Sequence, residues 1–108
     1  MSGGRNMNKK VYISGAISTD RNHRSKFKAA QKRLEEKGYI VLNPVELIQK
    51  EKDKTWLEYL IDCLELIKRE NPGSIYLLKN YMQSSGAQIE RLTFKKLGKK
   101  IMSEREDA

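Results

Sequence analysis

The chain has very little cysteine, histidine or proline: one cysteine, one histidine and two prolines among 108 residues. A single cysteine excludes an internal disulfide, and together with a single histidine it excludes a zinc site of the usual four-ligand kind within one chain. No stretch approaches the roughly 20 apolar residues of a membrane span, and no apolar run like that of a secretory signal follows the basic N-terminus. We therefore expect a reduced, cytoplasmic domain with no metal, no cofactor and no membrane partner.

The composition predicts one small globular domain with a basic surface. The chain is 38% hydrophobic and 33% charged, and its 22 Lys and Arg against 14 Asp and Glu give a formal net charge of +8. A positive field attracts the phosphates of a nucleotide or a nucleic acid, although a merely solvated basic surface has the same composition. The basic residues are scattered, and no aromatic–basic RNA-binding motif is present. We therefore do not expect nucleic acid as a partner.

Strand and helix patterns alternate along the chain. Residues 1–8 read as a disordered leader and 103–108 as a charged tail, which leaves 9–102 as the folded domain. The expected elements, in order, are a strand over 10–14, a helix over 25–37, a strand over 39–42, a helix over 55–69, a strand over 75–78, a helix over 85–96 and a strand over 100–102. This alternation is typical of βαβ units, so we predict an α/β domain with a parallel sheet of about four strands and helices on both faces.

The expected helix over 55–69 has the clearest pattern. Thr55 and Glu58 fit a capping box at its start. Its apolar residues recur at helical spacing on one face, namely Trp56, Tyr59, Leu60, Cys63, Leu64 and Ile67. Cys63 therefore reads as an inert core thiol. The face is broad enough for both core and subunit contacts, and a four-stranded sheet leaves open edges, so we expect a homodimer or higher homo-oligomer.

The helix over 85–96 has a similar start signal. Ser85 and Gln88 fit a capping box, and Ile89, Leu92 and Phe94 are the expected packing positions. Glu90 lies about one turn inside this helix and off those apolar positions. It is either a carboxylate at the cleft or a helix glutamate that faces solvent.

In open parallel sheets, ligands bind at the carboxyl ends of the strands, where the strand order reverses. The candidate binding segments are therefore 14–22, 43–44 and 79–85. The first has small and hydroxyl residues whose backbone N–H groups suit a phosphate, although an ordinary strand–helix loop has the same pattern. Asp62 is either an exposed residue or a second carboxylate beside Glu90. Two carboxylates in one site can divide acid and base roles.

Several short motifs in a fixed order carry a family resemblance. They are Val11-Tyr12-Ile13-Ser14-Gly15, Asn22, Phe27, Ala30, Gly38-Tyr39-Ile40-Val41, Asn43-Pro44, Leu78, Tyr81, Ser84, Gly86-Ala87, Glu90 and Leu97-Gly98. With them the chain resembles an uncharacterised bacterial and phage domain family related to the nucleoside 2-deoxyribosyltransferases. It also resembles, more distantly, the 2′-deoxynucleoside 5′-phosphate N-hydrolases. The resemblance covers nearly the whole chain and implies a Rossmann-like or flavodoxin-like sheet.

The resemblance also implies a site for a deoxynucleoside or its 5′-monophosphate. In the characterised relatives a glutamate attacks the anomeric carbon, and Glu90 matches its position, Tyr12 the tyrosine that orients it, and Asp62 the aspartate that handles the proton of the leaving base. The loop that holds the sugar 5′ end or its phosphate corresponds to Ser14, Gly15, Ala16, Ile17 and Ser18. Further expected substrate contacts are Asn22, Asn43, Tyr81, Ser84, Gly86 and Ala87.

One departure from the relatives leaves two functions open. Relatives usually have an acidic residue immediately before the third strand, where Gly73-Ser74 stand here. The leading hypothesis is cleavage or transfer of the N-glycosidic bond of a deoxynucleoside or deoxynucleotide. The alternative is a non-catalytic module of the same fold that binds a nucleotide-derived metabolite.

Overall fold

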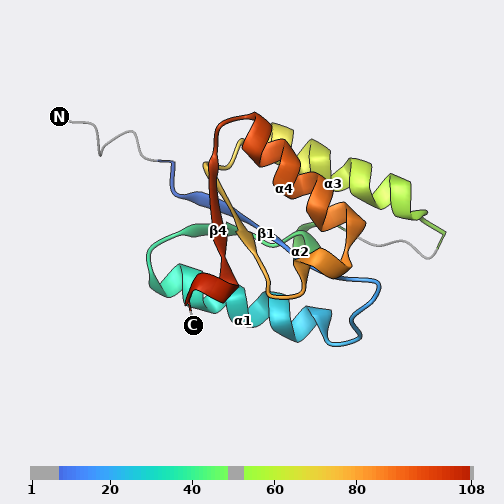
Figure 1. The fold of residues 1–108 in the computed structure, drawn as a ribbon, viewed down its shortest axis with the longest axis horizontal. Helices are drawn as coiled ribbons and strands as arrows, with labels where there is room; N and C mark the ends of the chain where they lie inside the picture. The colour runs from blue at the N-terminus through green and yellow to red at the C-terminus, as the bar shows by residue number, and fades with distance from the viewer. Residues whose placement is uncertain (1–7, 49–52, 108) are drawn as a thin grey trace.

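Four parallel strands in the order β2-β1-β3-β4 form the centre of the protein (Figure 1). They are β1 (Lys10–Ser14), β2 (Ile40–Leu42), β3 (Ser74–Leu77) and β4 (Lys100–Ser103) in a computed structural model that describes residues 8–48 and 53–107. Tyr12 of the central strand β1 pairs with Leu42 of β2 on one side and with Ile75 of β3 on the other. The predicted α/β fold is confirmed, and the strand order is that of a flavodoxin-like sheet.

Helices cover both faces of the sheet, with α1 (His23–Glu36) on one face and α3 (Trp56–Glu70) and α4 (Ser85–Lys96) on the other (Figure 1). This division follows from right-handed crossovers, because the chain moves one way from β1 to β2 and the opposite way from β2 to β3 and β4. Each face has its own core. On the α1 face the buried residues are Val11, Ile13, Phe27, Ala30, Leu34, Tyr76 and Leu78.

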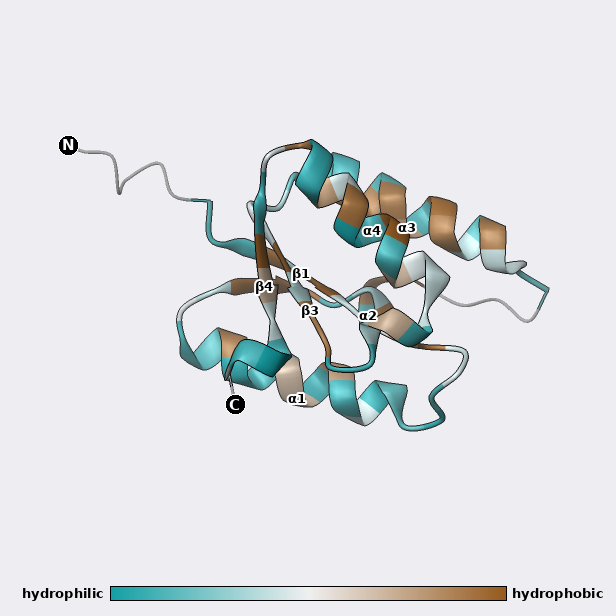
Figure 2. Ribbon diagram, in the orientation of Figure 1, coloured by the Kyte–Doolittle hydropathy of each residue, from teal (hydrophilic) through white to brown (hydrophobic). Residues whose placement is uncertain are grey.

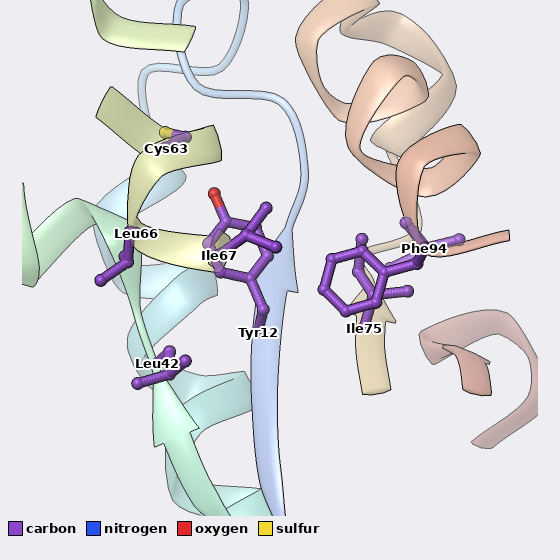
Figure 3. Close-up of a cluster of buried hydrophobic side chains, with 8 residues drawn as sticks. Tyr12, Leu42, Cys63, Leu66, Ile67, Ile75 and Phe94 are labelled. Carbon is purple, nitrogen blue, oxygen red and sulfur yellow. The ribbon is translucent and has the colours of Figure 1, made fainter. Parts of the chain in front are cut away.

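The second core lies between the sheet and the α3–α4 layer. Its buried residues are Tyr12, Leu42, Cys63, Leu66, Ile67, Ile75, Leu77 and Phe94 (Figure 3). Alternate residues of β1 therefore divide between the two cores, as the two-residue period of a strand requires. Tyr12 is fully buried within this second core, which places its hydroxyl beneath the α3–α4 layer.

Three short elements were not expected from the sequence. They are α2 (Pro44–Leu47) and the 3₁₀ turns η2 (Tyr81–Gln83) and η3 (Glu104–Asp107). The Asn43 side chain accepts a hydrogen bond from the Val45 N–H, so Asn43-Pro44 both ends β2 and begins a helix. Within the expected charged tail, the Glu104 carboxylate of η3 accepts from both the Arg33 guanidinium and the Lys79 N–H. Most of the expected leader, residues 1–7, lies outside the described residues.

The predicted bounds of α4 and the burial of Phe94 are confirmed, but the predicted N-cap and two of the three predicted packing positions were wrong. Ser84, not Ser85, is the N-cap and accepts from the Ala87 N–H, while the Gln88 side chain donates to the Met82 carbonyl. Ile89 and Leu92 are 38% and 51% exposed, and the buried residues of the helix are Ala87, Glu90 and Phe94. The buried face of α4 includes the carboxylate of Glu90, so its residues do not form a continuous apolar pattern. The apolar spacing therefore indicated the adjacent face, which carries Ile89 and Leu92.

Apolar side chains also remain on the outer surface of the α3–α4 layer, and Figure 2 shows both helices as more hydrophobic than α1. Trp56, Leu57 and Ile61 of α3 are all about half exposed, so Trp56 does not join the core as expected. The homo-oligomer inferred from the sequence stays a prediction. Among the described helices, none combines the length and the apolar character needed to cross a membrane.

The capping box of α3 gives a direct test of the fold. The Thr55 hydroxyl accepts from the Glu58 N–H, and the Glu58 carboxylate accepts from the Thr55 N–H. We expect Thr55→Ala to lower the free energy of unfolding by about 1 kcal/mol in urea titrations. Thr93→Ala removes a hydroxyl that bonds within α4, where alanine is the better helix former, and should cause little loss. Equal losses in the two variants would contradict the capping role.

Candidate active site

A pocket opens at the carboxyl end of β1, beside the point between β1 and β3 where the strand order reverses. It has a volume of about 180 Å³. The end of β1 and its following loop form one wall, and the rest of the lining comes from Phe27 of α1, Pro44 of α2, and the N-terminal halves of α3 and α4 with the residues just before them. The pocket therefore lies where the topology of an open parallel sheet predicts a ligand site.

Glu90 is buried in the wall of this pocket with both carboxylate oxygens hydrogen-bonded. The Tyr12 hydroxyl donates to Oε2 at 2.7 Å, and the Ser14 hydroxyl donates to Oε1 at 2.6 Å. Tyr12 and Ser14 are two residues apart on β1 and so point to the same face of the sheet. The Glu90 side chain is only 6% exposed. The strand therefore fixes the carboxylate in one orientation at the pocket surface.

The protonation of Glu90 is a balance of opposing effects. Burial raises its pKa, and hydrogen bonds from Ser14, Tyr12 and Cys63 lower it, for a net pKa of about 7. At neutral pH the side chain can therefore exist in both forms. A carboxylate of this kind can act as a nucleophile when ionised and as a proton donor when neutral.

Tyr12 is held rigidly as the donor in this pair. Its ring stacks on Phe94 with centroids 6.2 Å apart and an interplanar angle of 26°. Burial raises the pKa of its phenol well above the ordinary value, and the nearby Glu90 carboxylate raises it further. The phenol therefore stays protonated over the physiological range and donates to Glu90.

The α3 side chain that lies beside Glu90 is Cys63 and not Asp62. Cys63 lines the pocket together with Glu90 and packs in the same buried cluster as Tyr12. The Asp62 carboxylate instead accepts from the Lys54 ammonium at 2.6 Å. Lys54 lines the pocket, whereas Asp62 is not among its lining residues. One residue along a helix is a rotation of about 100°, so Asp62 points in a different direction from Cys63 and pairs with Lys54.

Most of the other predicted contacts do line the pocket. They are Tyr12, Ser14, Gly15, Ile17, Ser18, Ser84, Gly86, Ala87 and Glu90. Gly15 also meets a packing demand, because a Cβ there would lie 2.8 Å from Leu78 Cδ1. At Gly86 no atom would come closer than 3.7 Å to an added Cβ, so the absence of a side chain there leaves room on the pocket side.

Four predicted contacts lie elsewhere, in structural roles. Asn43 is buried and binds Gln31 and the Val45 N–H. Asn22 is exposed at the start of α1, and Tyr81 packs against the α3–α4 core.

Ala16 is the fourth of these residues and belongs to a link between the two loops beside the pocket. Its N–H donates to the Asn80 side chain at 3.2 Å. The same Asn80 amide donates to Asp20 at 2.8 Å. Asn80 thus joins the loop after β3 to the loop after β1.

Much of the α3 wall was not predicted from the sequence. Pro44 belongs to the predicted segment 43–44, and the lining residues that were not predicted are Ile13, Phe27, Lys54, Thr55, Trp56, Tyr59, Leu60 and Cys63. Trp56, Tyr59 and Cys63 follow the i, i+3, i+7 spacing of one helix face, and that face was assigned to core and subunit contacts. The signal that could have located it is the position of α3, whose first turns lie at the pocket end of the sheet.

Residues 9–103 match the family described as Domain of unknown function (DUF4406), so the chain belongs to that family. No curated protein and no solved structure matches the chain. Among the described residues, no group of three or more His, Cys, Asp or Glu side chains could hold a metal ion.

The raised pKa of Glu90 predicts a specific dependence of stability on pH. Between the ordinary pKa of 4.5 and about 7 the folded state binds more protons than the unfolded state, so this residue destabilises the fold as pH rises through that window. Glu90→Gln cannot ionise. Its unfolding free energy relative to wild type should therefore rise by at most about 3 kcal/mol between pH 4.5 and 7.5 in urea titrations. Subtracting the wild-type unfolding free energy from that of Glu90→Gln at each pH removes the contribution of all other titrating groups. If the two proteins lose stability in parallel as the pH rises, Glu90 does not have a raised pKa.

Proposed function

We propose that the protein cleaves or transfers the N-glycosidic bond of a deoxynucleoside or its 5′-monophosphate, with Glu90 as the nucleophile. The observation that carries the proposal is the pair of hydrogen bonds from Tyr12 and Ser14 that holds a buried carboxylate at the pocket wall. The motif resemblance to the deoxyribosyltransferases and N-hydrolases gives this carboxylate the position of their nucleophile. The aromatic side chains of Trp56 and Tyr59 offer surfaces on which a base could stack.

The proposed reaction has two halves. First the Glu90 carboxylate attacks the anomeric carbon, a C–O bond forms, and the C–N bond breaks with its electron pair leaving on the base. The base takes up a proton from the solvent or from a donor in the pocket. Water or a second base then attacks the same carbon and restores the carboxylate, and the proton of the incoming group leaves to solvent. The Tyr12 and Ser14 hydroxyls hold the carboxylate in place through both halves.

One observation favours the second candidate, a non-catalytic module that binds a nucleotide-derived metabolite. Glu90 is the only carboxylate among the lining residues described, and Asp62, the expected second acid, is paired with Lys54. A departing base would then lack the carboxylic acid that the relatives supply. Such a module would bind deoxynucleoside monophosphate in calorimetry and release no base over hours.

Base release separates the two candidates. Wild-type protein incubated with deoxynucleosides and their 5′-monophosphates should yield free base, measured by reversed-phase chromatography. Glu90→Ala and Glu90→Gln should reduce the rate about a thousandfold or more, because the covalent step is lost. The matched control is Glu65→Gln, which makes the same change on the exposed face of α3 and should retain full activity. Equal rates in wild type and Glu90→Gln would contradict the nucleophile.

Removal of the tyrosine hydroxyl should impair the nucleophile without emptying the core. Tyr12→Phe keeps the ring against Phe94 but removes the donor to Glu90. We expect kcat to fall about 10–100-fold. The acid limb of the kcat–pH profile should move to higher pH, because the loss of a donor raises the pKa of Glu90. Tyr39→Phe removes a hydroxyl on the α1 side and should leave both quantities unchanged; a profile shifted equally in both variants would argue against this role.

A further inference from the structure

A second cavity, which we call the α1-face cavity, lies on the other side of the sheet from the α3–α4 layer. Its volume is about 250 Å³. The polar lining residues are Lys26 and Arg33 of α1, Lys79 and Asn80 just after β3, and Glu104 of η3. In Figure 1 the C-terminal turn η3, drawn in red, lies beside α1. Among the described residues, none lines both this cavity and the pocket of the candidate active site.

The charges around the α1-face cavity are mostly positive. Lys26, Arg33 and Lys79 are cationic, and Glu104 is the single acidic residue among the described lining residues. Asp20, just outside the lining, pairs with Lys26 at 2.6 Å. Within the described part of the chain, no ion pair involves the ammonium of Lys79, whose residue is exposed. The cavity therefore keeps an excess of positive charge, which attracts anions.

The Glu104 carboxylate shows how this cavity holds an oxyanion. The Arg33 guanidinium donates to one carboxylate oxygen at 2.7 Å, and the Lys79 N–H donates to the other at 2.9 Å. A guanidinium combined with a backbone N–H suits a phosphate as well as a carboxylate, since both are planar or tetrahedral groups of acceptor oxygens. A phosphate monoester carries up to two negative charges and three terminal oxygens. It can therefore engage Lys26 and the Lys79 ammonium in addition to the two donors that Glu104 uses.

We propose that the α1-face cavity is a second binding site of this protein, which takes the phosphate group of a small ligand. The phosphate competes with Glu104 for the Arg33 guanidinium and the Lys79 N–H, and Lys26 and the Lys79 ammonium supply further positive charge. The site does not depend on the proposed function, because its lining is separate from that of the Glu90 pocket.

A purely structural role for the same contacts makes a different prediction. If Arg33 and Glu104 only fasten η3 to α1, removal of the Glu104 charge weakens the fold and has no favourable effect on any anion. If Glu104 competes with a phosphate, removal of its charge strengthens phosphate binding. The direction of this one effect separates the two roles.

The experiment is a titration of ¹⁵N-labelled protein with inorganic phosphate, and separately with glycerol 3-phosphate, at an ionic strength held constant with sodium chloride. The Lys79 amide reports on the site directly, because a bound phosphate replaces its present acceptor, Glu104. We expect saturable shifts at Lys79 and Asn80, and none at Gly86 and Ala87 of the other pocket. Tighter binding of glycerol 3-phosphate assigns the site to a phosphorylated small molecule, and tighter binding of inorganic phosphate assigns it to the free ion.

Charge variants give opposite expected effects. Arg33→Gln should weaken phosphate binding about tenfold, because a charge-assisted donor is lost, and Lys26→Gln should weaken it in the same direction. Glu104→Gln should strengthen it about threefold, because the competing charge is removed. The matched controls are Arg91→Gln on α4 and Glu65→Gln on α3, which make the same charge changes in the layer on the opposite face of the sheet. Both controls should bind phosphate as wild type does.

Three results would overturn the inference. One is the absence of a saturable shift at Lys79. Another is an equal loss of binding in Arg33→Gln and Arg91→Gln, which would show that phosphate responds only to the net charge. The third is weaker binding by Glu104→Gln. Because all of these readouts come from binding, they are independent of whether wild-type protein releases base.

Discussion

The candidate active site depends on the burial of one carboxylate against two hydroxyls of the first strand. A buried carboxylate without hydrogen bonds would cost several kcal/mol, and the Tyr12 and Ser14 hydroxyls offset much of that cost. Both must lie on the same face of β1, and α4 must place Glu90 above them. A one-residue slip of β1 against its neighbours would turn both hydroxyls to the α1 face and leave Glu90 without donors. The polar site thus also specifies the register of the sheet.

The function proposed here follows from how the topology distributes roles among the elements. The first strand supplies groups that hold the carboxylate, and α4 supplies the carboxylate. The first turns of α3 supply the aromatic wall, and the segment just before α3 supplies Lys54. These segments are distant in sequence and meet only because the strand order reverses between β1 and β3. The arrangement supports an attack on an electrophilic sugar carbon more directly than it supports general acid catalysis, because the second acid of the relatives has no counterpart among the described lining residues.

The sequence predicted the fold well because strand and helix patterns depend on local residue types. It also identified Glu90 and Tyr12, although only through the motif resemblance. The sequence-based predictions were wrong where they had to say which side of a helix faces the core or the pocket. The buried row of α4 contains Ala87, Glu90 and Phe94, which no apolar periodicity indicates. On α3, Asp62 and Cys63 are adjacent in sequence. Asp62 was expected in the pocket because a carboxylate can act as an acid, but packing turns the Cys63 thiol toward the pocket instead.

The side chain of Asn80 has a consequence for how the pocket meets a ligand. It accepts from the Ala16 N–H and donates to Asp20, and thereby joins the loops after β1 and β3. Two loops tied in this way lose little further conformational freedom on binding, so less of the binding free energy is spent on ordering them. Moving the two loops apart would break both hydrogen bonds, so the tie favours a strand-end side of the pocket that is already in place when a ligand binds.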